Sequence, residues 1–351
     1  MSVRSPFSVA LVVPLQGSEG MYGPSCELCA QLAAEEINAQ GGLLGRELRF
    51  VTVDGAARPA IVAAEVDALV AAGAVDAVVG WHISAVRVLL APRLALRVPY
   101  IYTALYEGGE RHPGVYLTGE TPGAQIFPAL RWMAHEVGVR RWCIVGNDYV
   151  WPRLSAAASR RFAPACGADI CDEIFVGLGT TDYVDALTRI ERGRCDGVLM
   201  FLVGADAVAF NRQFAERGLD AGHVRLTPLM DENMLLASGP ANVARLYTSS
   251  GYFQSLPTAE NLEFGAKYER RFGVEAPVLN SLGESCYEGM QLLAALVRQA
   301  GSADARSICA RAENTRYSGP RGLLRLHDGH VLQRMYLARP DGLDYDIICS
   351  L

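Results

Sequence analysis

Hydrophobic and polar positions along this chain follow two alternating periods, one typical of strands and one typical of helices. Residues 8–15 form a nearly continuous apolar run, and residues 23–40 then carry Ala, Leu and Ile at helical spacing until Gly41-Gly42 ends the pattern. The alternation continues with strands expected at 48–54, 77–80 and 99–102 and helices expected at 59–72 and 85–96. This β-α-β-α order indicates a parallel sheet covered by helices.

The pattern begins again near residue 141 and predicts a second sheet of the same kind. Strands are expected at 141–146, 169–176, 197–202 and 224–230, and strand-like runs return at 322–326, 331–339 and 344–349. We therefore predict an α/β protein of two lobes, residues 1–121 plus 252–320 and residues 122–251 plus 321–351. Since ligands bind at the carboxyl ends of strands in open α/β sheets, a ligand cleft is expected between the lobes.

Composition narrows the classes of function. The 351 residues carry 32 basic and 38 acidic side chains, a net charge of −6 with histidine neutral. Binding to a phosphate backbone usually needs a basic stripe, and no run of Lys or Arg appears, so no direct nucleic-acid partner is expected. No apolar run approaches the roughly 20 residues of a membrane helix, so no membrane span is predicted.

The cysteines and the apolar run near the start of the sequence indicate the cellular compartment of the protein. Nine cysteines, an odd number spread along a long chain, favour reduced thiols and a cytoplasmic protein. The apolar run at 7–15 lacks a small-x-small cleavage site and is interpreted as a strand. A periplasmic or extracellular location is the alternative if a leader was removed. Cys26 and Cys29 are interpreted as structural residues of a helix, whereas Cys166 and Cys171 could pair in an oxidising compartment.

Motifs for an enzyme are absent from the sequence. No G-x-G-x-x-G follows a strand, and no G-x-x-x-x-G-K-[ST], G-x-S-x-G or H-E-x-x-H occurs. The six histidines are scattered, and none stands at the i, i+4 spacing that places two imidazoles on one helix face. We therefore expect a binding protein rather than an enzyme, with no cofactor and no metal.

An aromatic segment follows the first strand of the second lobe. Residues 146–153 read Gly-Asn-Asp-Tyr-Val-Trp-Pro-Arg, in which Asp148 and Pro152 suit the start of a helix. Tyr149 and Trp151 each offer a flat apolar wall and one hydrogen-bonding group. Such a wall favours a small, uncharged polar ligand.

These residues resemble the type I periplasmic-binding-protein fold and, within it, the amide and urea receptors. The matching segments are 36–46, 102–108 and 147–153. The resemblance implies a sensor of a short-chain amide or urea, similar to the negative regulator of the aliphatic amidase operon. Such a sensor acts through an antiterminator-type regulator protein and is, by analogy, a homodimer. The alternative is the substrate-binding protein of an ABC transporter for amides, urea or branched-chain amino acids, with a permease as partner.

The resemblance also implies the ligand contacts, which come from loops at strand ends. They are His82, Ser84, Tyr102, Thr103, Tyr149 and Trp151. His82 and Trp151 stand where tyrosine is usual, and Ala104 replaces a threonine, so the identity of the ligand stays open.

Other interpretations of these residues stay open as well. Ser84 could cap a helix, Tyr102 could be an ordinary strand aromatic, and His82 could pack in the core. Asp231, with Glu232 beside it, follows another strand and could accept an ammonium or an amide N–H. Both acids could equally be first-turn residues of a short helix.

Overall fold

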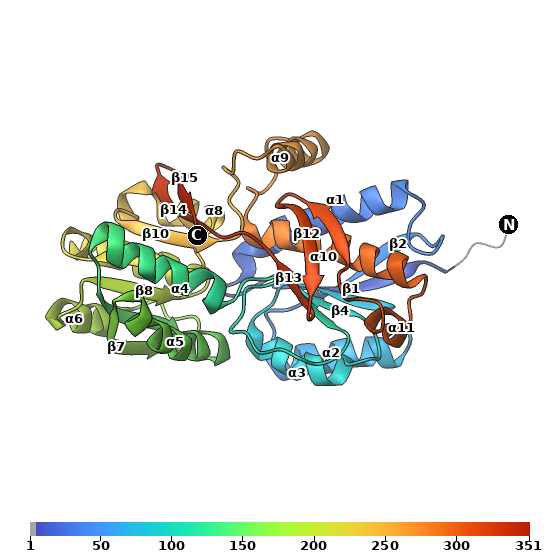
Figure 1. The fold of residues 1–351 in the computed structure, drawn as a ribbon, viewed down its shortest axis with the longest axis horizontal. Coiled ribbons are helices and arrows are strands. Elements are labelled where there is room, and N and C mark those ends of the chain that lie inside the picture. The colour runs from blue at the N-terminus through green and yellow to red at the C-terminus, as the bar shows by residue number, and fades with distance from the viewer. Residues whose placement is uncertain (1–4) are drawn as a thin grey trace. The chain divides into compact units, whose positions relative to one another are not determined.

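A computed structural model describes residues 5–351, which divide into two compact units (Figure 1). The first unit holds the chain up to Leu105 together with Gly109–Gly119 and Pro257–Gln333. The second holds Tyr106–Gly108, Glu120–Leu256 and Arg334–Leu351. Two α/β lobes are therefore present, as the hydrophobic pattern predicts.

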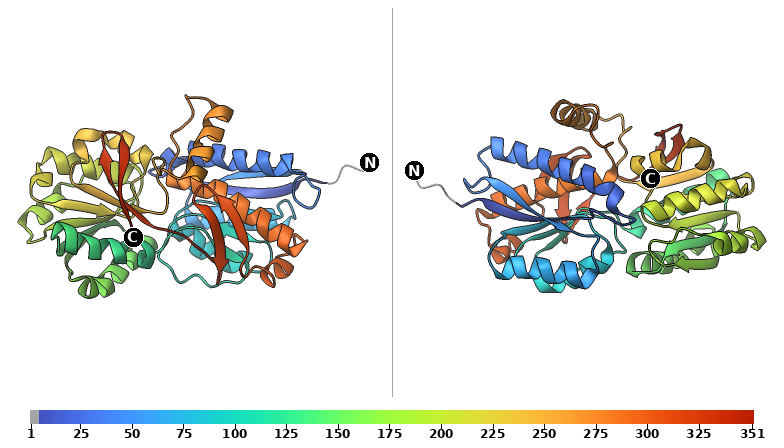
Figure 2. Two further views of the ribbon diagram at one scale, coloured as in Figure 1. Left: turned by 45° about the horizontal axis from the view of Figure 1, so that its top comes forward. Right: turned by 180° about the vertical axis from the view of Figure 1, so that it is seen from behind.

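The first unit is built on an eight-stranded sheet in the order β11-β12-β13-β5-β4-β3-β1-β2. Its strands are β1 (Phe7–Val13), β2 (Leu48–Asp54), β3 (Ala77–Gly80), β4 (Tyr100–Tyr102), β5 (Val115–Leu117), β11 (Arg316–Gly319), β12 (Gly322–His327) and β13 (His330–Leu332). The first five run parallel, and β12 pairs antiparallel with both β11 and β13. The helices are α1 (Gly23–Ala39), α2 (Pro59–Ala71), α3 (Ser84–Leu94), α9 (Ala259–Phe272), α10 (Ser281–Ala300) and α11 (Ala305–Cys309). Helices α1 and α10 pack together on one face of the sheet, and α2 and α3 pack together on the other (Figure 2).

The second unit repeats this plan with seven strands in the order β15-β14-β10-β9-β8-β6-β7. They are β6 (Arg141–Asn147), β7 (Asp169–Val176), β8 (Gly197–Phe201), β9 (Val224–Thr227), β10 (Leu246–Ser250), β14 (Tyr336–Asp341) and β15 (Asp344–Ser350). β14 pairs antiparallel with both β10 and β15, and the other neighbouring strands pair parallel. The helices are α4 (Pro122–Trp132), α5 (Val150–Phe162), α6 (Val184–Arg192), α7 (Ala205–Glu216) and α8 (Glu232–Ser238).

The expected lobe boundaries differ from the observed units, most of all at residue 321. Residues 321–333, predicted in the second lobe, belong to the first unit, because β12 and β13 extend the first sheet beside β5. The strand-like run predicted at 331–339 is two strands, β13 and β14, and the chain passes from the first unit to the second after Gln333. A hydrophobic pattern marks each strand, but it does not say which sheet edge the strand joins.

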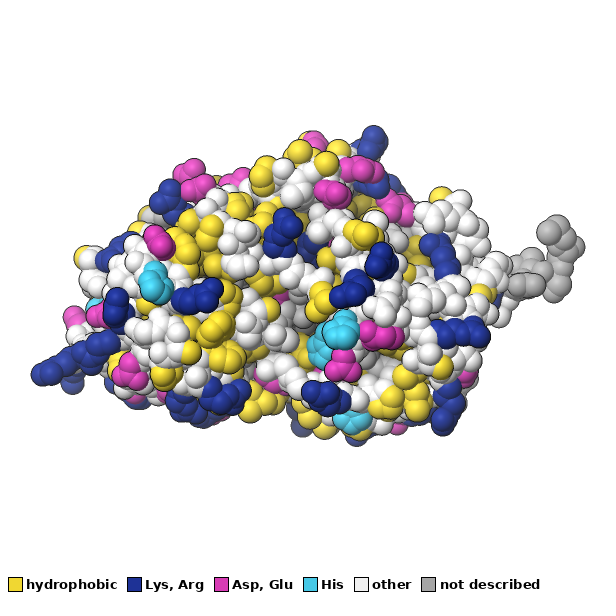
Figure 3. Space-filling model, in the orientation of Figure 1, with side chains coloured by type: hydrophobic (Ala, Val, Ile, Leu, Met, Phe, Trp, Pro, Cys, Tyr) yellow, Lys and Arg dark blue, Asp and Glu magenta, His cyan; other side chains and the backbone are white. Residues whose placement is uncertain are grey.

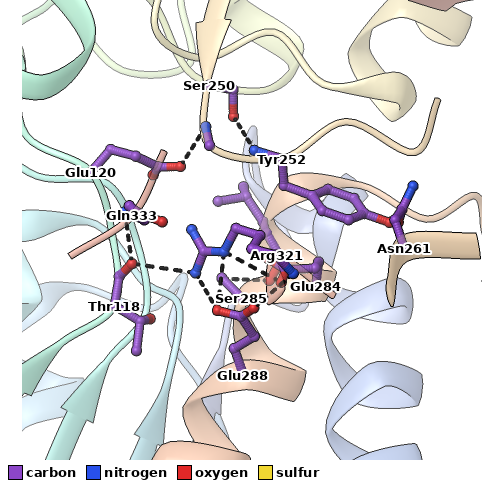
Figure 4. A network of polar contacts seen from close by, with 12 residues as sticks. Thr118, Glu120, Ser250, Tyr252, Asn261, Glu284, Ser285, Glu288, Arg321 and Gln333 are labelled. Atoms are coloured by element: carbon purple, nitrogen blue, oxygen red, sulfur yellow. Dashed lines mark hydrogen bonds and ion pairs between the residues drawn. The ribbon is translucent and has the colours of Figure 1, made fainter. Parts of the chain in front are cut away.

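A buried ion pair holds the β11–β12 hairpin inside the first unit (Figure 4). Arg321 Nη2 lies 2.5 Å from Glu288 Oε2 on α10, and Arg321 Nε lies 3.5 Å from Glu284 Oε1. The Thr118 carbonyl after β5 accepts hydrogen bonds from Arg321 Nη2 (3.5 Å) and from Gln333 Nε2 (3.1 Å). The hairpin, α10 and the end of β5 are therefore tied to one buried cation.

Charged groups on the surface are mixed in sign. On the face shown in Figure 3, basic and acidic side chains are interspersed, in keeping with the small negative net charge. In the part of the chain that the structure describes, no helix is long and apolar enough to cross a membrane.

The cysteines of the described residues are all free thiols. Cys166 and Cys171, the pair that an oxidising compartment could link, each donate to a different carbonyl, of Phe127 and Trp142 respectively, at 3.3 Å.

Gly80 ends β3 where this strand runs closest to β1. Its φ is +155°, and an added Cβ would lie 2.0 Å from the Val12 carbonyl oxygen. We expect Gly80→Ala to lower the free energy of unfolding by about 3 kcal/mol or more in urea denaturation, because backbone atoms would have to separate. Gly73→Ala is the control: its φ is +64°, but no atom lies within 4 Å of an added Cβ, so the loss should be about 1 kcal/mol. Equal losses would contradict this close approach.

Candidate functional site

The loops that follow β3 and β4 emerge at the same edge of the first sheet. Leu11, Val79 and Ile101 are register partners across β1, β3 and β4, so these parallel strands end side by side. Four of the predicted contacts, His82, Ser84, Tyr102 and Thr103, are brought together at this edge, and all four are buried. Their hydrogen-bond partners distinguish their roles.

His82 is a fully satisfied buried residue. Its Nε2 lies 2.8 Å from the Tyr100 hydroxyl and its Nδ1 lies 3.3 Å from the Ile83 carbonyl oxygen. Burial, with a smaller contribution from the charge of Arg87, lowers the pKa of His82 to about 3, so the ring is neutral. Tyr102 donates its hydroxyl to the His82 carbonyl at 2.7 Å. His82 and Tyr102 therefore fix the loop after β3 to the end of β4.

Ser84 is in a different situation, because its hydroxyl has no protein partner although the residue is 1% exposed. The helix α3 begins at Ser84 itself, and Ile83 at the cap position makes no side-chain cap bond, so Ser84 is not the cap. Trp81 Nε1, in the same loop, is also buried without a partner. Two buried polar groups of this segment therefore have no protein partner, and one of them, Ser84, stands in the first turn of α3, where an oxygen acceptor is favoured.

Thr103 faces α10 rather than open space. Its Oγ1 lies 3.8 Å from Cys286 Sγ, and its methyl group lies where a side chain on Gly289 would be, 2.5 Å from an added Cβ. The glycine lets the end of β4 pack directly against the helix. Thr103 therefore fixes the end of β4 against α10.

In the second unit, Asn147 joins the ends of three strands. Its Nδ2 donates to Asp206 Oδ2 at 2.6 Å, and its Oδ1 accepts from the Val203 backbone at 3.0 Å. The same Asp206 oxygen accepts from the Gly179 backbone at 2.8 Å. Asp206 was not among the predicted residues, since an acid in the first turn of a helix carries no signal of a buried network.

Tyr149 and Trp151 follow β6 at the start of α5. Their ring centroids are 6.3 Å apart, and Trp151 packs edge-on against Phe201 at 5.8 Å. Trp151 is buried, whereas Tyr149, at the cap position of α5, is half-buried. Of the two predicted aromatic contacts, Tyr149 is the one with exposed surface.

Asp231 and Glu232 form a pair of adjacent buried acids after β9. Asp231 Oδ1 accepts from the Met234 backbone at 3.4 Å and caps α8, and Glu232 Oε1 accepts from the Gln254 backbone at 2.7 Å. The second oxygen of each carboxyl, Asp231 Oδ2 and Glu232 Oε2, is buried without a partner. Burial raises the pKa of Asp231 to about 7, and burial together with the charge of Asp231 raises the pKa of Glu232 to about 8.

The two units differ in the buried polar atoms that have no protein partner. In the first unit these are Trp81 Nε1 and Ser84 Oγ, and in the second they are the carboxyl oxygens Asp231 Oδ2 and Glu232 Oε2. Trp81 was not predicted as a contact, although it directly follows β3, whereas Glu232 was considered beside Asp231 as a possible acceptor. Among the described residues, no group of three or more His, Cys, Asp or Glu side chains is arranged to hold a metal ion.

Comparison with known proteins places these features in context. A family model described as periplasmic binding protein matches residues 6–344. The "Leu/Ile/Val-binding protein homolog 6" of Brucella melitensis is 26% identical over 236 residues, which are 65% of this chain and 59% of that protein. The match thus spans less than two thirds of the relative's length.

Solved structures match along almost the whole chain. A solute binding protein of an ABC transporter from Rhodopseudomonas palustris BisB5, in complex with 3,4-dihydroxybenzoic acid, is 26% identical with a TM-score of 0.87, covering 99% of this chain and 98% of that one. A branched-chain amino acid transporter substrate binding protein of Streptococcus pneumoniae, in complex with isoleucine, is 18% identical with a TM-score of 0.84 and covers 99% of both chains. The second likeness concerns the fold alone. The closer resemblance to amide receptors stays a prediction.

The two buried acids make stability depend on pH. Their raised pKa values mean that the folded protein holds protons that the unfolded chain, with carboxyl pKa values of about 4, has released. The free energy of unfolding should therefore fall as pH rises from about 4 to about 8. We expect a fall of at least about 2 kcal/mol between pH 5 and pH 8 in denaturant titrations. Asp231→Asn combined with Glu232→Gln should remove most of it.

The control for this pH dependence is Asp148→Asn. Asp148 is exposed beside Arg153, so its replacement should leave the pH dependence between pH 5 and pH 8 unchanged. A wild-type stability that does not change across this range would contradict the assignment.

Proposed function

We propose, from the premise that this chain belongs to the periplasmic-binding-protein family, that it is the solute-binding component of an ABC importer. The family match over residues 6–344 and the full-length similarity to a solute binding protein of an ABC transporter support this role. The partner would then be a membrane permease and the working compartment the periplasm. These were the alternatives in the sequence analysis. The amide-sensing regulator with an antiterminator partner, and the cytoplasmic location, have no such support.

We infer the chemical class of the solute from the buried carboxyl oxygens of Asp231 and Glu232 that have no partner. A buried acceptor without a donor is costly, and a bound solute that supplies N–H or O–H groups removes that cost. Ser84 Oγ and Trp81 Nε1 are buried hydrogen-bond donors that have no acceptor in the protein, so a solute oxygen would satisfy them. A solute with an oxygen acceptor would satisfy the groups of the first unit, and a solute with hydrogen donors would satisfy the carboxyl oxygens of the second unit.

Amino acids, short amides and urea have both an oxygen acceptor and hydrogen donors. A benzoate without further polar groups would satisfy only the groups of the first unit, because its carboxylate offers no donor. A dihydroxybenzoate has donors in its hydroxyl groups. The half-buried ring of Tyr149 supplies an apolar contact for any of these solutes. We therefore propose a solute of the amino acid or amide class.

A binding panel tests this class. The purified protein is heated with leucine, isoleucine, butyramide, urea, benzoate or 3,4-dihydroxybenzoate, and each positive is titrated by calorimetry. A solute at about 100 times its dissociation constant stabilises the fold by about 2.7 kcal/mol, which is visible as a higher melting temperature. We expect a rise with an amino acid or an amide and none with benzoate.

The other outcomes of the panel are also decisive. A response to amides or urea alone would favour the sensor over the amino-acid importer. A response to benzoate, or to no solute at millimolar concentration, would contradict the assigned class.

Ser84→Ala tests the first unit. Removing a donor that only the solute satisfies should weaken binding of the panel's positive solute at least tenfold, because a hydrogen bond to a buried group is lost. The melting temperature without solute should change by less than about 2 °C, since no protein partner is lost. Ser155→Ala is the matched control, because Ser155 Oγ is also buried and unpartnered but belongs to α5 of the second unit. Equal affinities of the two variants would contradict a role for Ser84.

A further inference from the structure

Helices α1 and α10 of the first unit approach each other unusually closely near their first turns. An added Cβ on Gly283 would lie 3.1 Å from Ser25 Cβ, and Asn280 Nδ2 donates to Ser25 Oγ at 2.7 Å. Cys26 directly follows Ser25, and Cys286 lies one turn after Gly283. Residues separated by 260 positions in the sequence are therefore placed side by side by helix packing.

The two thiols are in direct contact. A hydrogen bond joins the side chains of Cys286 and Cys26, and both residues are completely buried. This bond lowers the pKa of the Cys286 thiol below its ordinary value, although burial opposes the effect. Cys29, one turn further along α1, lacks such a bond, and burial raises its pKa well above the ordinary value. Since the thiolate is the attacking species in disulfide exchange, Cys286 is in a more favourable environment for attack than Cys29.

We propose that Cys26 and Cys286 form a disulfide when the chain folds in an oxidising compartment. The oxidant is a small-molecule or protein disulfide. The Cys286 thiolate attacks one of its sulfur atoms and releases the other as a thiol. Cys26, having lost its proton, then attacks the mixed disulfide and releases the second thiol. Two cysteines are thereby oxidised, one disulfide is reduced to two thiols, and the number of protons is conserved.

The bond lies directly behind the loops that carry the candidate site. Cys286 Sγ is 3.8 Å from Thr103 Oγ1 and hydrogen-bonds to the backbone of Trp81. A bridge here joins α1 to α10, which follows residues 120–256 of the second unit in the sequence, and so closes a very long loop. The inference adds to the proposed importer role, with which an oxidising compartment agrees, but its test uses no solute and does not depend on that role.

Because both sulfur atoms are buried, the thiols have to be oxidised while the chain folds. In the folded, reduced protein neither sulfur is accessible, so oxidised glutathione should leave both thiols intact. The full chain is therefore denatured and reduced, refolded in a mixture of oxidised and reduced glutathione, alkylated and mapped by peptide mass spectrometry. We expect a peptide pair linked through Cys26 and Cys286 and a loss of two of the nine free thiols. The melting temperature should be at least about 5 °C higher than that of the reduced protein.

Three single variants supply the controls. Cys26→Ser and Cys286→Ser should abolish both the linked peptides and the thermal shift, whereas Cys29→Ser, on the same helix and equally buried, should keep both. A refolded protein with all nine thiols free would overturn the proposal, as would a Cys29–Cys286 link. Loss of two of the eight remaining thiols on refolding of Cys26→Ser would do so too. Solute binding in the panel above can succeed or fail independently of these results.

Discussion

Parallel pairing of strands is the constraint from which the candidate site of each unit follows. Because β1, β3 and β4 run parallel and in register, the loops after them must emerge at one edge, and the same holds for β6, β8 and β9 in the second sheet. Trp81 and Thr103 therefore lie at one edge of the sheet although α3 separates them in the sequence. The close approach of Gly80 to the backbone of β1 is part of the same packing, since a side chain there would force the strands apart.

Polar groups at these edges fall into two sets with different consequences. His82 and Asp206 have their hydrogen bonds made within the protein, so they hold loops in place and gain nothing from a solute. The hydroxyl of Ser84 and one oxygen each of Asp231 and Glu232 are buried without partners. A buried polar group without a hydrogen bond raises the free energy of the folded protein. A solute that supplies the missing hydrogen bond lowers this free energy again. This difference, rather than residue type, separates supporting residues from candidate contacts.

The packing of α1 against α10 brings together residues that are not part of the loops at the strand ends. The small residues Ser25, Gly283 and Gly289 let α1, α10 and the end of β4 approach one another, and Cys26 and Cys286 meet as a result. The thiols are inert while the fold is closed, so their oxidation state records the conditions under which the chain folded. A bridge at this point stabilises the framework behind Trp81 and Thr103 without touching the solute.

The sequence by itself determined the α/β class, the two sheets, most strand positions and the loops where polar residues gather, because these follow from local periodicity and strand order. Residue type alone could not separate His82, whose ring is fully bonded in the core, from Ser84, whose hydroxyl has no partner. Nor could it assign β12 and β13 to the first sheet, reveal the ion pair of Arg321 with Glu288, or bring Cys26 to Cys286. Only the tertiary structure decided these features, since burial and hydrogen-bond partners depend on segments far apart in the chain, and no local pattern encodes which segments meet.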